Sequence, residues 1–261
     1  MSTDISSRLQ LALEAAREAG QITLEYFRHE DLEVERKDDD SPVTIADRRV
    51  EAHLRDRIAQ SFPQDAVLGE EMPDHEGTSG FRWILDPIDG TKSFIHGVPL
   101  YGTLIGVEQE GQPVLGVVYV PALEECVYAA VGQGAWYVQG TKPPQAAHVS
   151  QRPLSQGLFL TSEVANFEQV GRRDAYDRLQ AAARLSRSWG DAYGYLMVAT
   201  GRADVMVDPI ANVWDVAPLL PILEEAGGHF TDWQGRRTIH SGQGVATNGV
   251  TLDEVLAILG R

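Results

Sequence analysis

A run of short apolar segments between residues 81 and 138 restricts the possible folds more than any other part of the chain. The segments are rich in Val, Ile and Tyr, and Gly-containing turns such as Glu110-Gly-Gln-Pro113 and Gly132-Gln-Gly134 separate them. This pattern is typical of an antiparallel meander. The expected strands cover residues 81–85, 102–108, 114–120, 126–131 and 135–138.

Helices are predicted on the N-terminal side of this sheet. One covers Ser7 to about Arg28, where apolar side chains recur every three to four residues behind a cap at Ser6 or Ser7. Another runs from near Thr44 to residue 62, and the proline that follows ends it. The polar stretch 33–41, with three aspartates at 38–40, is expected to be a solvated loop or a hairpin tip. The first half is thus predicted to be two helices packed on a sheet.

After about Ala147 the pattern changes to an alternation of strands and helices. The expected strands cover residues 158–161, 184–188, 203–208, 229–233 and 245–248. The expected helices cover residues 176–183, 191–200, 216–226 and 252–259. This alternation favours a second half of the α/β type, which divides the chain into residues 1–147 and 148–261.

The balance of charge excludes several classes of partner. Asp and Glu number 38 against 22 Lys and Arg, which gives a formal net charge of −16. A field of this sign repels DNA, RNA and anionic membranes, and no apolar run approaches the ~20 residues that span a bilayer. Cys126 is the single cysteine, so a disulfide framework and a thiolate zinc site are excluded, and without a visible secretory signal we expect a cytoplasmic protein. A chain this acidic can still bind a phosphate if the local sign of charge is inverted, which bound divalent cations do most simply.

The segment Asp86-Pro-Ile-Asp-Gly-Thr91 follows an expected strand and carries two closely spaced carboxylates. Such carboxylates repel each other unless a cation lies between them, and Mg²⁺ prefers oxygen ligands, to which the Ile88 carbonyl adds another. Gly90 allows close approach of the backbone to a ligand, and Gly90-Thr91 opens a helical turn whose free amides favour phosphate oxygens. Asp-Pro and Asp-Gly are also ordinary turn formers, so this segment alone leaves a turn and a metal site open.

Other acidic residues have structural interpretations when each is taken alone. Glu70-Glu71 follows a glycine and is typical of a solvated loop. Asp215, directly after Trp214, is typical of a helix N-cap, and Thr44-Ile-Ala-Asp47 matches a capping box.

Taken together, these signals have the order and spacing of the inositol monophosphatase superfamily, which the chain resembles over nearly its full length. The matching elements are the helix start at Thr44–Asp47, Gly69-Glu-Glu71, Trp83-Ile-Leu-Asp-Pro-Ile-Asp-Gly-Thr91 and Trp214-Asp215. The resemblance implies the layered α/β/α/β/α sandwich of that family, with its site in the cleft between the two halves.

The resemblance also implies a role for individual residues. The metal ligands would be Glu70, Asp86, the Ile88 carbonyl, Asp89 and Asp215, which would hold two or three Mg²⁺ ions. Asp86 would bridge two ions, Glu70 would support one of them, and Asp89 with Asp215 would support the other. Thr91, with Asp47 behind its hydroxyl, would position and deprotonate the attacking water, while the ions activate that water and stabilise the leaving oxygen. The implied reaction is hydrolysis of a phosphate monoester, and Glu71 is expected to have a supporting role.

Segments near the implied site resemble the histidinol-phosphate phosphatase branch of the superfamily. They are Thr91-Lys-Ser-Phe94, where inositol-type enzymes usually have asparagine at position 92, and Trp189-Gly-Asp-Ala-Tyr-Gly-Tyr195, where cysteine is common in place of Ala192. Histidinol phosphate carries an ammonium group and an imidazole, which carboxylates would bind. The residues predicted to contact substrate are Gly90, Thr91, Lys92, Trp189, Asp191 and Asp208.

Alternatives remain open for several of these residues. Asp191 is either a substrate contact or a helix N-cap, and Trp189 either stacks on an imidazole or fills core. Lys92 either contacts phosphate or pairs with an acid, and Arg187 is the weakest candidate. Tyr195 is expected in the core.

Functional alternatives also remain. Inositol-1-monophosphatase, or a phosphatase of another sugar or nucleotide monoester, is the second choice within the family. A non-catalytic protein that binds a phosphorylated metabolite is the alternative of another class. The resemblance suggests a homodimer whose partner is a small phosphorylated metabolite, with neither nucleic acid nor membrane as a ligand.

Overall fold

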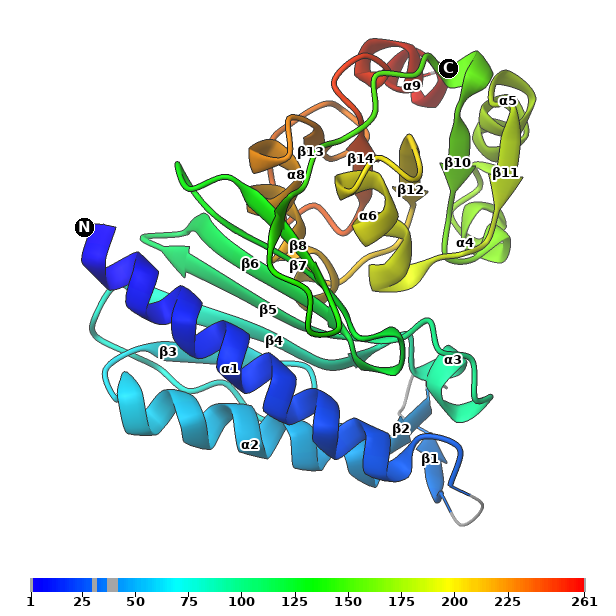
Figure 1. Ribbon diagram of the computed structural model, residues 1–261. Coiled ribbons are helices and arrows are strands. Elements are labelled where there is room, and N and C mark those ends of the chain that lie inside the picture. Colours follow the sequence, from blue (N-terminus) through cyan, green and yellow to red (C-terminus); the bar gives the residue numbers. More distant parts are fainter. Residues whose placement is uncertain (1, 30–31, 37–41, 261) are drawn as a thin grey trace.

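Five layers, α/β/α/β/α, make up the computed structural model, which describes residues 2–29, 32–36 and 42–260 (Figure 1). Helices α1 (Ser2–Tyr26) and α2 (Ile45–Ser61) form the first layer. Helix α1 begins before the cap predicted at Ser6 or Ser7, and its first turn contains Asp4, an acidic residue that favours a helix N-terminus. Helix α2 begins as predicted, with Thr44 and Asp47 forming a capping box.

A seven-stranded sheet forms the second layer. Its strands are β3 (Ala66–Gly69), β4 (Phe81–Asp89), β5 (Gly102–Gln109), β6 (Gln112–Val120), β7 (Glu125–Ala130), β8 (Ala135–Gln139) and β9 (Gln145–Ala146). The order β3-β4-β5-β6-β7-β8-β9 confirms the predicted antiparallel meander from β4 onward. Strand β3 was not predicted, and it pairs parallel to β4 at the edge of the sheet.

A two-stranded hairpin and a short helix lie at the end of the sheet where β4 finishes (Figure 1). Strands β1 (Val34–Arg36) and β2 (Pro42–Thr44) pair antiparallel, which supports the hairpin alternative, while Asp38–Asp40 lie outside the described residues. Helix α3 (Thr91–Ile95) follows β4, with Gly90 as its N-cap at a φ of 83°, a conformation that favours glycine.

A five-stranded sheet forms the fourth layer. Its strands are β10 (Leu158–Leu160), β11 (Leu185–Arg187), β12 (Val205–Asp208), β13 (His229–Thr231) and β14 (Gly244–Thr247), in the order β11-β10-β12-β14-β13. The helices of this half are α4 (Val164–Gln169), α5 (Arg173–Ala182), α6 (Asp191–Ala199), α7 (Val213–Val216), α8 (Leu219–Glu225) and α9 (Leu252–Leu259). The 3₁₀ turns η1 (Pro121–Leu123) and η2 (Leu154–Gln156) complete the described elements. The single helix predicted over residues 216–226 is divided, because Pro218 interrupts it between α7 and α8.

Separate apolar clusters join successive layers. One lies between the α1–α2 pair and the seven-stranded sheet, and includes Leu54 and Trp83. Another surrounds α6 and α8, which lie between the two sheets, and includes Leu196 and Leu223 (Figure 1). A third, around Phe159, covers the outer face of the five-stranded sheet beneath α4, α5 and α9. Each sheet is therefore covered on both faces.

A pair of glycines lets the α7–α8 corner pack directly on the seven-stranded sheet. Gly106 of β5 and Gly116 of β6 are cross-strand partners. A Cβ atom at Gly116 would lie 2.1 Å from the Pro218 carbonyl oxygen, and one at Gly106 would lie 2.7 Å from the Ala217 Cβ. The backbone just after Asp215 thus rests on a stretch of sheet that has no side chains.

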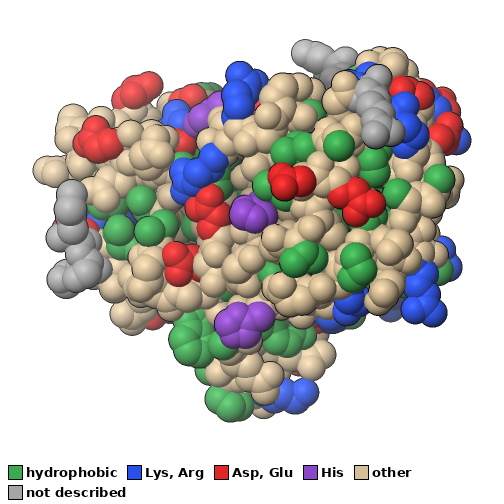
Figure 2. Space-filling view, turned by 90° about the horizontal axis from the view of Figure 1, so that it is seen from above, with side chains coloured by type: hydrophobic (Ala, Val, Ile, Leu, Met, Phe, Trp, Pro, Cys, Tyr) green, Lys and Arg blue, Asp and Glu red, His purple; other side chains and the backbone are tan. Residues whose placement is uncertain are grey.

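The face that lies uppermost in Figure 1 is shown in Figure 2. Acidic and basic side chains are interspersed over it, and hydrophobic side chains lie between them singly and in small groups. Surfaces of this kind are ordinary for a face in contact with water. Within the described ranges, the structure contains no helix with the length and apolar character needed to cross a bilayer.

Candidate active site

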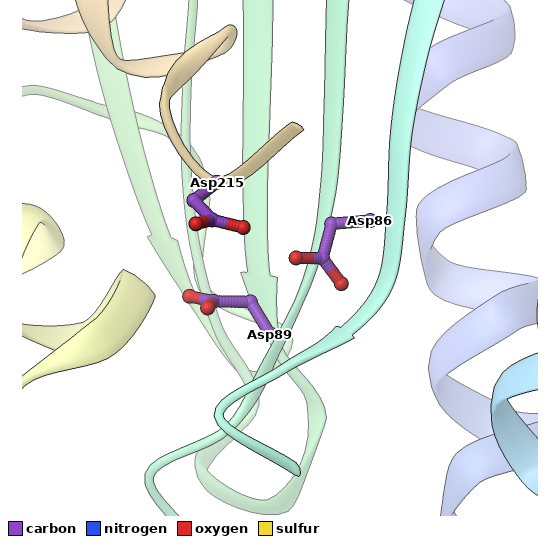
Figure 3. A group of neighbouring side chains, drawn as sticks. All are labelled: Asp86, Asp89 and Asp215. Carbon is purple, nitrogen blue, oxygen red and sulfur yellow. The ribbon is translucent and has the colours of Figure 1, made fainter. Parts of the chain in front are cut away.

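Three carboxylates from two separate segments meet beside the end of β4. Asp86 and Asp89 come from β4, and Asp215 comes from α7 in the other half of the chain. One carboxylate oxygen from each residue lies within 4.8 Å of the other two. Figure 3 shows the three side chains pointing toward one another from these elements. The convergence predicted for these three residues is therefore present.

The local backbone explains how Asp86 and Asp89 reach the same place. Strand β4 continues through Pro87, and its pairing with β5 shifts register between Asp86 and Asp89. Such a bulge re-aims side chains that regular alternation would send to different places. The Asp86 carboxylate accepts a hydrogen bond from the Ile88 backbone N–H at 3.1 Å, and Thr103 donates its hydroxyl to the Pro87 carbonyl at 2.9 Å. Both bonds fix the bulge.

The N-cap of α7 is Asn212, so the N-cap interpretation of Asp215 is wrong, although Asp215 does take part in the capping box as well as in the carboxylate cluster. It is the third residue of α7, and its carboxylate accepts a hydrogen bond from the Asn212 backbone N–H at 2.7 Å. Asn212 completes the capping box from its own side chain. The side chain of Asp215 is therefore held by the start of its own helix.

Glu70 enters the same region from β3. Its backbone N–H donates to the Leu85 carbonyl at 3.3 Å, which places it beside the start of the Asp86 segment. Glu70, Asp89 and Asp215 all line one cavity of about 750 Å³. The structure thus brings the fourth predicted carboxylate to the site, at the edge of the sheet.

Burial and mutual repulsion raise the pKa values of the clustered carboxyl groups. Burial is the largest cause for Asp86, followed by the charge of Glu70, and its pKa lies well above the ordinary value. The pKa of Asp89 is raised well above its ordinary value by burial and then by Asp191. Burial raises the pKa of Asp215 to about 7. A cluster with these shifts has a strong affinity for positive charge.

The chemistry of these side chains fits a hard divalent cation. The clustered donors are carboxylate oxygens, and Mg²⁺ prefers oxygen ligands. A cation between the carboxylates removes the repulsion that raises their pKa values. The ligand assignments at Glu70, Asp86, Ile88, Asp89 and Asp215 stay predictions.

The two residues predicted to activate water make other hydrogen bonds in this structure. Thr91 donates its hydroxyl to the Ile88 carbonyl at 3.0 Å. The Asp47 carboxylate accepts from the Thr44 hydroxyl at 2.6 Å and from the Thr44 backbone N–H at 2.8 Å. Burial raises the pKa of Asp47 to about 6. Among the described residues no hydrogen bond joins Asp47 to Thr91, so their catalytic pairing stays a prediction.

The predicted substrate residues share the cavity. Those that line it are Gly90, Thr91, Lys92, Trp189, Asp191 and Asp208. Asp191 is the first residue of α6 at a φ of 53°, and Gly190 is the N-cap, so the N-cap alternative for Asp191 is wrong. Burial and then the charge of Asp208 raise the pKa of Asp191 to about 6.

Asp208 is the most enclosed of these residues. Its carboxylate accepts hydrogen bonds from Thr161, from the backbone and side chain of Ser162, and from the Tyr195 hydroxyl at 2.9 Å. Burial raises the pKa of Asp208. Tyr195 is buried in the core, as predicted. Asp208 therefore contributes charge to the cavity while its oxygens are bound within the protein.

Lys92, Trp189 and Arg187 lie nearer the solvent. Lys92 forms an ion pair with Glu163 at 2.6 Å, which is the alternative of pairing with an acid. Trp189 is 42% exposed at the cavity, so the alternative that it fills core is wrong. Arg187 donates to the Ser186 carbonyl at 2.7 Å and is exposed.

Comparisons with known proteins agree with this geometry. The sequence profile described as "Inositol monophosphatase family" matches residues 4–260. The chain belongs to the inositol monophosphatase family. It is 45% identical over 254 residues to a histidinol-phosphatase of Chlorobaculum parvum, covering 97% of this chain and 96% of that protein. It is 39% identical over 252 residues to a histidinol-phosphatase of Mycobacterium tuberculosis, covering 96% and 97%.

Solved structures of other proteins share the fold. The extragenic suppressor protein suhB from Bartonella henselae superposes with a TM-score of 0.90 at 26% identity, over 98% of this chain and 99% of that one. An inositol monophosphatase from Zymomonas mobilis superposes with a TM-score of 0.85 at 31% identity, over 98% of both chains. The predicted family and layered fold are confirmed, and the chain is a metal-dependent phosphatase of this family.

Sequence reasoning missed two polar residues that organise this site. Ser162 accepts a hydrogen bond from the Asp191 backbone N–H at 2.8 Å and donates to Asp208 at 3.0 Å, so it links the two acids. Glu51 of α2 is buried and holds the segment that follows Glu70. A usable signal was present for Glu51, because it interrupts the apolar face of α2 one turn after Asp47.

Proposed function

We propose that the chain hydrolyses histidinol phosphate with the help of two or three Mg²⁺ ions. The observation that supports this proposal most strongly is the full-length identity of 45% to a protein named histidinol-phosphatase. The cavity supports it, because Asp191 and Asp208 lie in the same cavity as Asp89. Their negative charge suits a substrate that carries an ammonium group and an imidazole next to its phosphate.

The carboxylates are proposed to bind the cations at the place where the phosphate reacts. Asp86, Asp89 and Asp215, with Glu70 and the Ile88 carbonyl, are the proposed ligands. Bound Mg²⁺ ions lower the pKa of a bound water and neutralise charge on the phosphoryl oxygens.

Asp47 and Thr91 are the proposed positioning and proton-accepting residues. A pKa of about 6 suits Asp47 for accepting a proton near neutral pH. Thr91 must exchange its present hydrogen bond to Ile88 for this role. The backbone amides of Gly90 and Thr91 at the start of α3 are the proposed phosphate contacts.

Phosphate release from a panel of esters tests this proposal. The panel contains histidinol phosphate, inositol 1-phosphate and adenosine bisphosphate, each with Mg²⁺ and with a chelator. We expect kcat/KM to be highest for histidinol phosphate, by about tenfold or more, since one additional charged contact is worth about 1.5–3 kcal/mol. Absence of Mg²⁺-dependent hydrolysis for every ester would favour the non-catalytic binding protein instead.

Inositol phosphate is the second candidate, and one observation favours it. Asp208 already accepts hydrogen bonds from Thr161, Ser162 and Tyr195, which reduces its need for a cationic partner. A neutral polyol could then bind without leaving the Asp208 carboxylate in need of a partner. Equal or greater kcat/KM for inositol 1-phosphate in the same panel would select this function.

A further inference from the structure

The side chain of Glu51 reaches from α2 to the chain that follows Glu70. Glu51 has no exposed surface. One carboxylate oxygen accepts a hydrogen bond from the Glu71 backbone N–H at 2.7 Å, and the other accepts from the Met72 backbone N–H at 3.1 Å. A single carboxylate thus binds two successive amides of the turn that carries Glu70.

Arg55, one helical turn further along α2, completes this contact. Its Nε donates to Glu51 at 2.8 Å, and its Nη2 donates to the Met72 carbonyl at 3.0 Å. The guanidinium therefore neutralises the buried carboxylate and also binds the same turn. A buried charge with such partners is tolerated, whereas an unpaired one is costly.

The residue before Glu70 leaves space for this carboxylate. A Cβ atom at Gly69 would lie 2.2 Å from one Glu51 carboxylate oxygen and 2.8 Å from the other. The carboxylate therefore packs directly against the backbone at the end of β3. On the other side, the Glu70 N–H donates to Leu85, so the backbone of Glu70 is held from both directions.

We propose that Glu51, supported by Arg55, is a positioning residue that holds Glu70 in place to bind a divalent cation. The inference rests on the proposed function, in which Glu70 is a ligand. Glu51 fixes the peptide groups on the C-terminal side of Glu70, which limits the directions available to its side chain. Residues behind metal ligands that fix their orientation typically change metal affinity about 10–100-fold when they are mutated.

Calorimetric titration of the metal-free protein with Mg²⁺ tests this role directly. In Glu51→Gln the amide nitrogen would face a backbone N–H, so the turn loses one of its two bonds. We expect the Kd for Mg²⁺ to rise about 10–100-fold. Arg55→Gln, which leaves the carboxylate in place, is expected to cause a smaller rise in the same direction.

Asp232→Asn is the matched control. Asp232 is also fully buried, and its carboxylate accepts the backbone amides of Gln234 and Arg236 at 2.9 Å and the Arg236 guanidinium at 2.6 Å. It is not among the residues that line the site cavity. We expect this variant to lose thermal stability like Glu51→Gln while its Kd for Mg²⁺ stays at the wild-type value.

Kinetics provide a second readout that a purely structural role would not change. In Glu51→Gln the Mg²⁺ concentration for half-maximal activity should rise with the Kd, and excess Mg²⁺ should restore kcat at an unchanged KM for the ester. An unchanged Kd for Mg²⁺ in Glu51→Gln, beside normal Mg²⁺ binding and turnover in the wild type, would overturn this inference alone. A wild-type protein that binds no Mg²⁺ would overturn the proposed function as well.

Discussion

At the scale of single residues, the clustered carboxylates of the site lower the stability of the metal-free fold. Asp86, Asp89 and Asp215 are brought within 4.8 Å of one another, and each has a raised pKa. Carboxyl groups so placed destabilise the metal-free fold once they lose their protons. Their presence together fits the proposed binding of a cation by all three.

Substitution of Asp89 separates binding chemistry from folding. Asp89→Asn removes a proposed ligand charge but keeps the shape and the acceptor for the Ala192 backbone N–H. Loss of a few kcal/mol of charge stabilisation in the transition state should lower kcat/KM on the order of 100-fold or more. Because repulsion within the cluster falls, the metal-free protein should melt at the same or a higher temperature. Normal turnover by this folded variant at saturating Mg²⁺ would refute the ligand assignment.

Asp191 provides the test of substrate choice at residue scale. Its φ of 53° favours asparagine over alanine as a replacement, so Asp191→Asn removes the charge with little backbone strain. We expect KM for histidinol phosphate to rise about tenfold, since one charged contact is lost, and KM for inositol 1-phosphate to change much less. Steady-state kinetics on both esters measure the difference between the two changes in KM. Equal effects on both KM values would remove the electrostatic reason for preferring the cationic substrate.

At the scale of elements, three short structures place the proposed ligands. The bulge in β4 turns Asp86 and Asp89 to the same side, β3 ends at Gly69 just before Glu70, and the α7–α8 corner positions Asp215. The corner depends on the bare stretch of sheet at Gly106 and Gly116. Packing in one layer therefore controls the position of a carboxylate from another.

A methyl group at Gly116 should disturb this packing. In Gly116→Ala the new Cβ would begin 2.1 Å from the Pro218 carbonyl oxygen, so the α7–α8 corner must move. Overpacking of this kind costs about 1–3 kcal/mol, which urea unfolding would measure. The shift should also raise the Mg²⁺ concentration needed for half-maximal activity. A loss of stability with an unaltered Mg²⁺ requirement would mean that Asp215 does not depend on the corner.

The predicted and missed elements differ in how much of their stability is local. The meander and the start of α2 were predicted because alternating apolar residues and the Thr44–Asp47 capping box are local signals. Strand β3 has four residues and depends on parallel pairing with β4, which no local pattern encodes. Helix α4 was not predicted either, and it has only six residues, too few for a clear helical pattern. The division at Pro218, by contrast, had a local signal that the single predicted helix overlooked, because proline interrupts a helix interior.

At the scale of the whole molecule, the candidate site is assembled from both halves of the chain. Asp86 and Asp89 were predicted together because they are neighbours in sequence, whereas the place of Asp215 beside them came from the family resemblance. Side-chain contacts such as Ser162 with Asp208, or Glu51 with Glu71, arise only when the layers pack. Sequence motifs thus identified the carboxylates, and the fold was needed to find the residues that hold them.

The buried acids with raised pKa values should make the free energy of unfolding fall as pH rises. Acids with lowered pKa values, the more usual case, make it rise with pH. The pKa of Asp215 is raised to about 7, and those of Asp47 and Asp191 to about 6, from an ordinary value of 3.8. Between the ordinary pKa and each raised pKa, the folded chain holds protons that the unfolded chain has released. The free energy of unfolding therefore falls as pH rises through this range. Acids with lowered pKa values, such as Asp65, have the opposite effect, but they act below about pH 4.

Thermal unfolding of the metal-free protein between about pH 5 and pH 8 measures this dependence. We expect the Tm with a chelator to fall over that range. Mg²⁺ binds the deprotonated carboxylates of the folded state, so it should raise the Tm more at the upper pH than at the lower one. Asp89→Asn should flatten both trends, because one member of the repelling cluster no longer ionises. A metal-free Tm that rises with pH, or an equal effect of Mg²⁺ at both ends, would show that these carboxyl groups do not share a cation.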